Sequence, residues 1–261
     1  MVAKTDLKAR LLDLVTGTLE LTRDGGRDIG SVCDVLQIVK EDPGFAARLL
    51  GEKAVVLVAP EKARTIPGSD LALTLDDCEQ FLREFCGITG YAVDVHQVPA
   101  KPEGDFWPDP CHSALTYDRL AELIVEKGVP HYDWVPDFLR RQVDRSFDAR
   151  KAEDGNYVLY TPAGIEAIKA RPEFKGVSYL RLWEDKAKVL TCREAVILWL
   201  FVSWKTGGKT KLDRKGWTRT GSRSVLGFGV YVLACVDRLR VYWNDPALGY
   251  PCGSARSAVS A

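Results

Sequence analysis

Several features that would assign a protein to a common functional class are missing from these 261 residues. There is no excess charge of either sign, because 36 Lys and Arg balance 36 Asp and Glu, so no overall field attracts nucleic acid or a membrane surface. The seven cysteines are odd in number and form no C-x-x-C pair. This pattern argues against a disulfide framework and a zinc site, and fits a reducing cytoplasm.

A continuous apolar run is also missing from the N-terminal stretch. Residues 1–14 carry a charge every few positions, which predicts neither a signal peptide nor a membrane span. We therefore expect a protein made in the cytoplasm, whose route to a virion or a displayed surface would be other than Sec-type export.

The length allows one large domain or two modest ones, and we expect a boundary after residue 88. Residues 1–88 are predicted to form a helix-rich region for assembly or docking. Apolar residues recur at helical spacing between 7 and 39, residues 54–59 read as a buried strand, and Thr74 begins a capped helix.

Residues 89–261 are expected to mix helices and strands. Turn residues and apolar periodicity predict helices around 120–124 and 138–139, and a helix opening at Thr161-Pro162. Alternation predicts strands at 91–98, 157–160 and 179–183, and residues 99–110 are predicted to be a loop. The strongest core element is a helix over 191–202, which a capping box begins and which is apolar on every side.

The C-terminal stretch predicts a β-ribbon, with strands at 230–235 and 238–243 around a turn at Val236-Asp237. In the second strand, strict alternation separates a core face from a surface face that includes Arg238 and Asn244. In the first strand the alternation fails. Either both faces of that strand are buried, or one face is an exposed apolar patch used for binding.

Four motifs frame this ribbon: W-T-R-T at 217–220, G-S-R at 221–223, W-N-D-P at 243–246 and G-S-A-R-S-A-V-S at 253–260. Together with the unrelated side chains between them, they resemble the variable protein of a diversity-generating retroelement. The likeness is good over residues 190–261, weaker over 90–190 and absent before, and it is nearest to viral and archaeal or candidate-phylum members.

The resemblance implies an α+β protein with a C-type lectin fold of the formylglycine-generating-enzyme-like subtype. In that family, error-prone reverse transcription rewrites codons at template adenines, here over about residues 224–252. It also marks Asp133 and Trp134 as a feature of the fold. The positions expected to be variable and to face a ligand are Val225, Leu226, Phe228, Tyr231, Leu233, Cys235, Arg240, Tyr242, Ala247, Leu248, Tyr250 and Cys252. The positions expected to be fixed scaffold are Trp217, Arg219, Leu239, Val241, Trp243, Gly253 and Arg256.

The function expected from this arrangement is non-enzymatic, hypervariable recognition of a macromolecular ligand, namely a protein receptor, with no cofactor and no nucleic acid partner. Aromatic and arginine side chains dominate the binding energy of protein interfaces. One alternative is a calcium-dependent carbohydrate-binding lectin, suggested by W-N-D at 243–245, although the partner motifs E-P-N and Q-P-D are missing. The other is a formylglycine-generating-type enzyme, for which Cys235 and Cys252 would have to be an active pair.

Three further patterns are weaker. The sequence G-G-K-T at 207–210 is not a phosphate loop, because Ser203 stands where the first glycine is required and a buried helix precedes it. Seven basic residues and one acid lie between 205 and 223, a run for which we expect a solvated face. His112, His131 and Asp133 have no metal-ligand spacing.

Overall fold

The computed structural model describes residues 71–89, 100–167, 172–251 and 253–258, which belong to a compact unit spanning Ile66–Ala261. The helices expected between 7 and 39 and the strands expected at 54–59 and 91–98 lie outside the described residues. Within the described part, no helix has both the length and the apolar character needed to cross a membrane.

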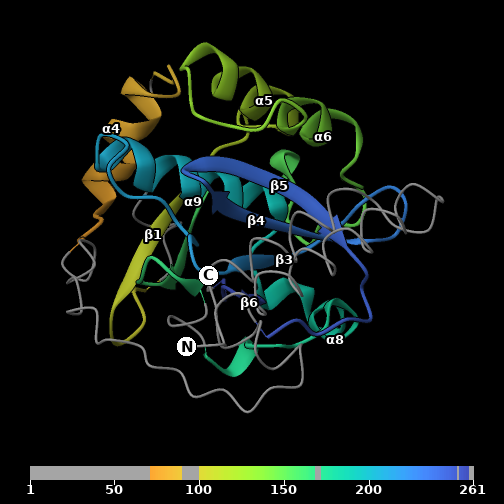
Figure 1. Ribbon diagram of the computed structural model, residues 1–261. Coiled ribbons are helices and arrows are strands. Elements are labelled where there is room, and N and C mark those ends of the chain that lie inside the picture. Colours follow the sequence, from red (N-terminus) through yellow and green to blue (C-terminus); the bar gives the residue numbers. More distant parts are fainter. Residues whose placement is uncertain (1–70, 90–99, 168–171, 252, 259–261) are drawn as a thin grey trace, which may run out of the picture. The chain divides into compact units, whose positions relative to one another are not determined.

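The unit is an α+β arrangement organised around a four-stranded sheet (Figure 1). The strand order is β5-β4-β3-β6, with β3 at Trp217–Arg223, β4 at Gly229–Cys235, β5 at Arg238–Asn244 and β6 at Gly253–Ala255. Neighbouring strands are antiparallel, except that β6 runs parallel to β3. The chain therefore leaves the sheet after β5 and returns to its other edge.

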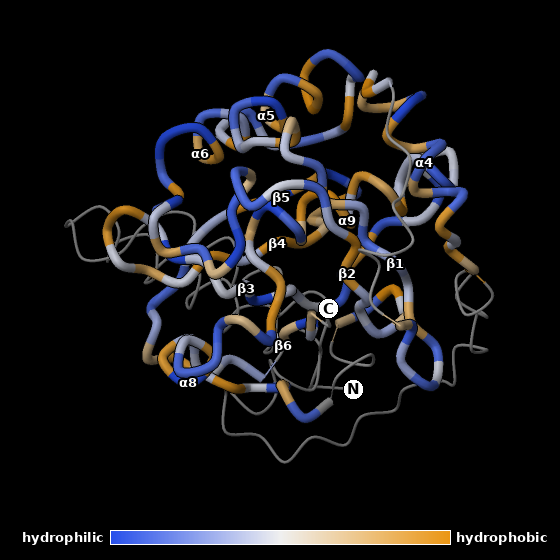
Figure 2. Tube along the Cα trace, turned by 180° about the vertical axis from the view of Figure 1, so that it is seen from behind, coloured by the Kyte–Doolittle hydropathy of each residue, from blue (hydrophilic) through white to orange (hydrophobic). Residues whose placement is uncertain are grey.

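Helix α9 (Cys192–Lys205) packs against one face of this sheet and forms the centre of the core. Thr191 accepts a hydrogen bond from the Glu194 amide, and the Glu194 carboxylate accepts one from the Thr191 amide, so the predicted capping box is present. Every residue from Cys192 to Val202 is buried. Figure 2 shows the same pattern, with apolar colour along α9 and β4 in the interior.

The remaining elements surround this core. Strands β1 (Phe106–Cys111) and β2 (Tyr157–Pro162) form a separate antiparallel pair that contacts α9. Helix α5 (Tyr117–Glu126) packs on α6 (Val135–Arg141), which in turn contacts β5. The other described elements are α4 (Leu75–Glu84), α8 (Tyr179–Glu184) and the short 3-10 turns Ala152–Asp154, Pro172–Phe174 and Lys186–Lys188.

The predicted β-ribbon is confirmed, and the structure decides which face of its first strand is buried. Val236 and Asp237 form the turn with φ of 49° and 61°, the backbone that matches the twist of a two-residue hairpin. The residues that face α9 are Val230, Val232 and Ala234 on β4, and Leu239 and Val241 on β5. Tyr231, Leu233 and Cys235 therefore lie on the outer face of the sheet, turned away from α9.

Three predictions about local structure are wrong. Residues 179–183 form helix α8 and not a strand, because Ser178 caps the helix by accepting from the Arg181 amide. Thr161 and Pro162 end strand β2 and do not open a helix. Residues 106–110, expected in a loop, belong to β1, where Pro108 and Pro110 are tolerated because each strand of a two-stranded sheet has a free edge.

Helix α4 shares its core with α9. The ring of Phe81 lies 5.1 Å from that of Phe201 and 5.7 Å from that of Trp204. The predicted Thr74 cap is present, with Asp77 as its acid. The sequence placed this helix in the N-terminal region 1–88, whereas the compact unit begins at Ile66.

Candidate ligand-binding surface

Arg219 fixes the chain that leads into β6. Its side chain is fully buried, and its guanidinium donates to the carbonyls of Gly253 at 3.0 Å and Tyr250 at 2.9 Å. A Cβ at position 253 would collide with the indole of Trp217, which explains why glycine stands there. The predicted scaffold positions Trp217, Arg219 and Gly253 therefore lie together, and Arg219 holds main-chain atoms of the loop that leads into β6.

Arg256 is a second buried anchor, with 1% of its surface exposed. Its guanidinium donates to the carbonyls of Gly164 at 2.9 Å and Ile165 at 3.0 Å, and pairs with the Asp213 carboxylate at 3.2 Å. Asp213 also accepts hydrogen bonds from the Ala167 amide and the Thr218 hydroxyl. This network ties the C-terminal strand to the segment after β2.

The β3–β4 loop is held through its main chain. Ser224 is buried, its hydroxyl accepts from the Phe228 amide at 3.1 Å, and its own amide donates to the Phe228 carbonyl at 2.7 Å. The amide of Val225 donates to the Gln142 carbonyl at 2.8 Å. The side chains of Val225 and Leu226 remain 54% and 66% exposed, so both are accessible to a ligand.

The loop after β5 is also held through its main chain. The Asp245 carboxylate accepts from the Ala247 amide at 2.8 Å, and the Leu180 amide donates to the Pro246 carbonyl at 3.2 Å. Ala247 is exposed and Leu248 is 45% exposed. Both loops therefore present apolar side chains to solvent while polar scaffold groups hold their backbones.

On the outer sheet face, two predicted ligand-facing residues are buried instead. Tyr231 is 3% exposed, because its ring lies between those of Trp217, at 5.5 Å, and Tyr242, at 6.4 Å. Arg240 is 7% exposed, and its guanidinium lies 5.4 Å from the Tyr242 ring and 6.0 Å from those of Tyr231 and Trp134. Both side chains are buried within this face, so the prediction that they face a ligand is wrong.

The other predicted ligand-facing residues on or beside the sheet are half-buried, namely Phe228, Leu233, Cys235, Tyr242 and Tyr250, whereas Cys252 lies outside the described residues. Of the predicted scaffold, Leu239 and Val241 are fully buried. Trp243 is half-buried, and its ring stacks on that of Phe228 at 4.3 Å. Phe228 therefore packs against the scaffold through one side of its ring.

Tyr132 and Trp134 complete the outer face, although the ribbon sequence does not reveal them. The Leu239 amide donates to the Pro130 carbonyl at 2.8 Å and the Tyr132 amide donates to the Leu239 carbonyl at 3.2 Å, which lays this segment along the edge of β5. The Tyr132 and Trp134 rings stack at 4.6 Å, and Trp134 is 40% exposed. The one sequence signal was the resemblance, which marked Trp134 as a feature of the fold.

Polar groups that could suggest metal or redox chemistry are engaged in local contacts. The Asn244 side-chain oxygen accepts from the Asp245 amide, and a ring nitrogen of His131 lies 2.6 Å from the Val129 carbonyl. The Tyr132 hydroxyl donates to the Cys235 sulfur at 3.1 Å. Burial, then this contact, raises the pKa of Tyr132 to about 12. These groups hold turns and edges in place.

Comparisons with protein-family models, with curated proteins and with solved structures found no match for this chain. The surface itself is therefore the only guide to what the protein binds. Exposed side chains stand on two loops at one end of the sheet, and an aromatic face with a central arginine lies on its outer side. Both features belong to one chain segment, residues 217–258, together with the edge segment at Tyr132 and Trp134.

Proposed function

We propose that this protein is a non-enzymatic binding protein of the diversity-generating retroelement type, which displays interchangeable side chains on a C-type lectin-like scaffold. Its ligand is a macromolecule, most simply a protein receptor. The ligand contacts the two loops at 225–228 and 247–250, together with the half-buried aromatic residues beside them.

The observation that carries this proposal is how the loops are fixed. Arg219, Ser224 and Asp245 hold main-chain amides and carbonyls, which every amino acid except proline supplies in full. The side chains of Val225, Leu226 and Leu248 contribute little burial where they stand. A position that is held by its backbone and not by its side chain can change identity without loss of the fold.

The chemistry of the surface supports a protein partner. Exposed Leu226 and Leu248 stand at loop tips, Trp134 is partly exposed, and the half-buried Tyr242 and Tyr250 offer rings with a polar tip. Large amphipathic side chains on a rigid frame give contact area at a low cost in conformational entropy. Clusters of this composition are enriched at the centres of protein interfaces.

The coding DNA provides the most direct test of the diversification. The proposal expects a near-identical repeat of the segment that encodes residues 224–252, close to a reverse transcriptase gene. Differences between the two copies should fall at adenines of the repeat and in codons for the displayed positions, such as Val225, Leu226 and Leu248. Differences spread evenly over all codons, including those for Arg219 and Arg256, would contradict it.

Binding can be tested without knowledge of the natural receptor. A surface-displayed library randomised at Val225, Leu226, Ala247 and Leu248 should yield clones that bind one chosen purified protein, such as lysozyme, after selection. A matched library at four exposed positions outside the surface, Arg83, Lys101, Glu122 and Glu153, serves as the control. Equal enrichment from both libraries would contradict a dedicated binding surface.

A further inference from the structure

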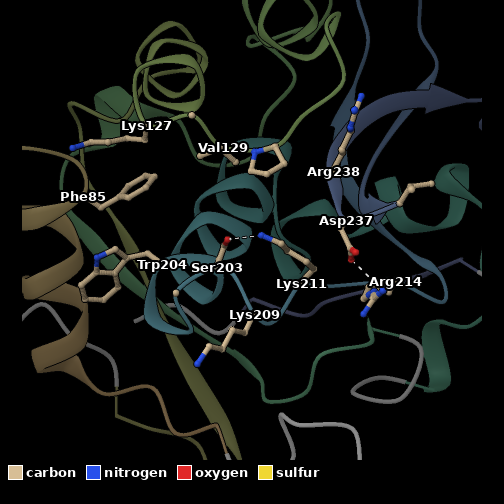
Figure 3. A pocket seen from close by; sticks show the side chains of 15 residues that line it. Phe85, Lys127, Val129, Ser203, Trp204, Lys209, Lys211, Arg214, Asp237 and Arg238 are labelled. Carbon is tan, nitrogen blue, oxygen red and sulfur yellow. Dashed lines mark hydrogen bonds and ion pairs between the residues drawn. The ribbon is translucent and has the colours of Figure 1, made fainter.

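A concave site lies at the opposite end of the β4–β5 ribbon from the displayed loops. The cavity measures about 650 Å³, within the range of small-molecule pockets. It is bordered by the C-terminal end of α9, the loop that follows it, the end of α4, the α5–α6 connection and the β4–β5 turn (Figure 3). It therefore shares no lining residue with the loops at 225–228 and 247–250.

The lining of this cavity is strongly basic. Five cationic side chains border it, and the single acid among the lining residues is Asp237, whose carboxylate pairs with Arg214 at 3.1 Å. The five cations are Lys127, Lys209, Lys211, Arg214 and Arg238. A concave site lined by one sign of charge concentrates ligands of the opposite sign. The local excess stands out because the whole chain is neutral.

Lys211 is the most informative of these cations. It is 7% exposed, its ammonium donates to the Ser203 hydroxyl at 3.1 Å, and it lies 5.1 Å from the Trp199 ring. Among the described residues no carboxylate lies within ion-pair distance of it. Burial lowers the pKa of this ammonium, and the charge of Asp237 opposes that effect only in part. A buried cation without a counter-charge is unfavourable, and a bound anion would remove that cost.

The loop amides beside Lys211 are already engaged. The amides of Gly207, Gly208 and Lys209 donate to carbonyls of Trp204, Ser203 and Thr206, and so complete the end of α9. An anion here would therefore be held by lysine and arginine side chains and not by a backbone cradle. The rejection of a phosphate loop stands, whereas the expected solvated face is wrong for Lys211, which is buried.

Aromatic rings border the same cavity. Figure 3 shows Trp204 and Phe85 along one side and Arg214, Asp237 and Arg238 along the other, with Lys211 between them. Trp204 and Phe85 are each half-buried. A planar ring can stack on an aromatic side chain while attached phosphates reach the cations.

We propose that this cavity binds a nucleotide, with its phosphates on Lys211 and its base against Trp204. The site is independent of the displayed loops, so it does not depend on the proposed recognition function. Its ligand chemistry is a compact polyanion joined to a planar ring, which distinguishes it from the protein partner proposed for the loops.

Isothermal titration calorimetry on the full chain tests this proposal with three probes: ATP, pyrophosphate and adenosine. ATP should bind, pyrophosphate should bind more weakly, and adenosine should give no heat in the same concentration range. Lys211→Met should weaken ATP binding by about tenfold or more, because one charge-assisted hydrogen bond is lost. Lys101→Ala, at an exposed lysine outside the cavity, should leave it unchanged.

Trp204→Leu tests the proposed base contact separately from the phosphate contacts. It should remove the preference for ATP over pyrophosphate and leave pyrophosphate binding intact. The thermal midpoint of Lys211→Met should equal or exceed that of the wild type, which shows that a loss of binding is not a loss of folding. No ATP binding at millimolar concentration, or equal ATP binding by wild type and Lys211→Met, would overturn the proposal, as would an oligonucleotide that binds far more tightly and displaces ATP.

Discussion

The β3–β4 loop and helix α9 carry apolar side chains of the same kind and use them in opposite ways. In α9, Leu198 and Phe201 are fully buried and their packing holds the helix in place. In the loop, Val225 and Leu226 are more than half exposed, and polar groups such as the Ser224 hydroxyl hold the backbone. Apolar side chains are therefore indispensable where they pack and replaceable where the main chain is anchored.

The largest expected effect is in the helix. Phe201→Ala should lower the free energy of unfolding by about 3–5 kcal/mol, because it removes a fully buried ring that packs on Phe81 and Trp204. Chemical denaturation monitored by circular dichroism measures this change. Leu180→Ala is the matched control, since Leu180 is 52% exposed, and its effect should stay below about 0.5 kcal/mol. Similar losses of unfolding free energy in both variants would contradict the distinction between packed and exposed apolar side chains.

The second-largest loss of stability is expected at the buried arginine anchors. Arg256→Ala should cost about 3 kcal/mol, because it leaves the buried Asp213 carboxylate without its cation and two carbonyls without a donor. Arg256→Lys keeps the charge but not the forked geometry, so its thermal midpoint should lie between those of wild type and Arg256→Ala. A midpoint for Arg256→Ala equal to the wild-type value would show that the network does not hold β6.

The same anchor region should make stability depend on pH. Burial, then the nearby Asp213 carboxylate, raises the pKa of Glu166 to about 7, although the amides of Arg214 and Lys215 oppose this. In the unfolded chain glutamate ionises near pH 4.3, so the folded state holds its proton to higher pH. This contribution to stability is present below about pH 4 and falls as the pH rises towards 7.

Glu166→Gln removes that titration. Relative to the variant, the wild type should lose on the order of 2 kcal/mol of unfolding free energy between about pH 4 and pH 7. Urea denaturation of both proteins across this range measures the difference. A difference that stays constant, or that grows in favour of the wild type as the pH rises, would show that the carboxyl group ionises normally in the folded state.

The smallest expected effect is at the loop tip. Leu226→Asp should change the unfolding free energy by less than about 0.5 kcal/mol, because the side chain is 66% exposed and its neighbours hold the backbone. Tyr231→Asp on the adjoining strand should be far more destabilising, since it places a charge in a buried aromatic cluster. Thermal unfolding of the two variants compares them directly, and equal losses would contradict the distinction between displayed and supporting positions.

Sequence reasoning succeeds where the signal is local. The capping box at Thr191 and Glu194 and the uninterrupted apolar run after it predict α9. The alternation of Leu239 and Val241 predicts the core face of β5. The sequence also places Val225, Leu226 and Leu248 at exposed positions, although on the strength of a family resemblance and not of the residues alone.

Sequence reasoning fails where the burial or secondary structure of a residue depends on residues far away in the chain. The burial of Arg240 involves Trp134, which the chain brings to β5 from more than a hundred positions earlier. Nothing within β5 itself signals that contact. In α8, apolar residues at 180 and 182 imitate strand alternation, and only the Ser178 cap distinguishes the helix. In the sequence, Lys211 belongs to a run of basic residues, and only its packing beside Trp199 shows that it is buried.

A deep mutational scan of residues 217–258, with protease resistance of the displayed protein as the measure of folding, tests the central claim most directly. The account predicts that Val225, Leu226, Ala247 and Leu248 accept nearly every substitution, charged residues included, whereas Arg219, Gly253 and Arg256 accept almost none. The contrary result would be folding that survives at those four loop positions only with apolar side chains, since the loops would then be held by their side chains and not by their backbone.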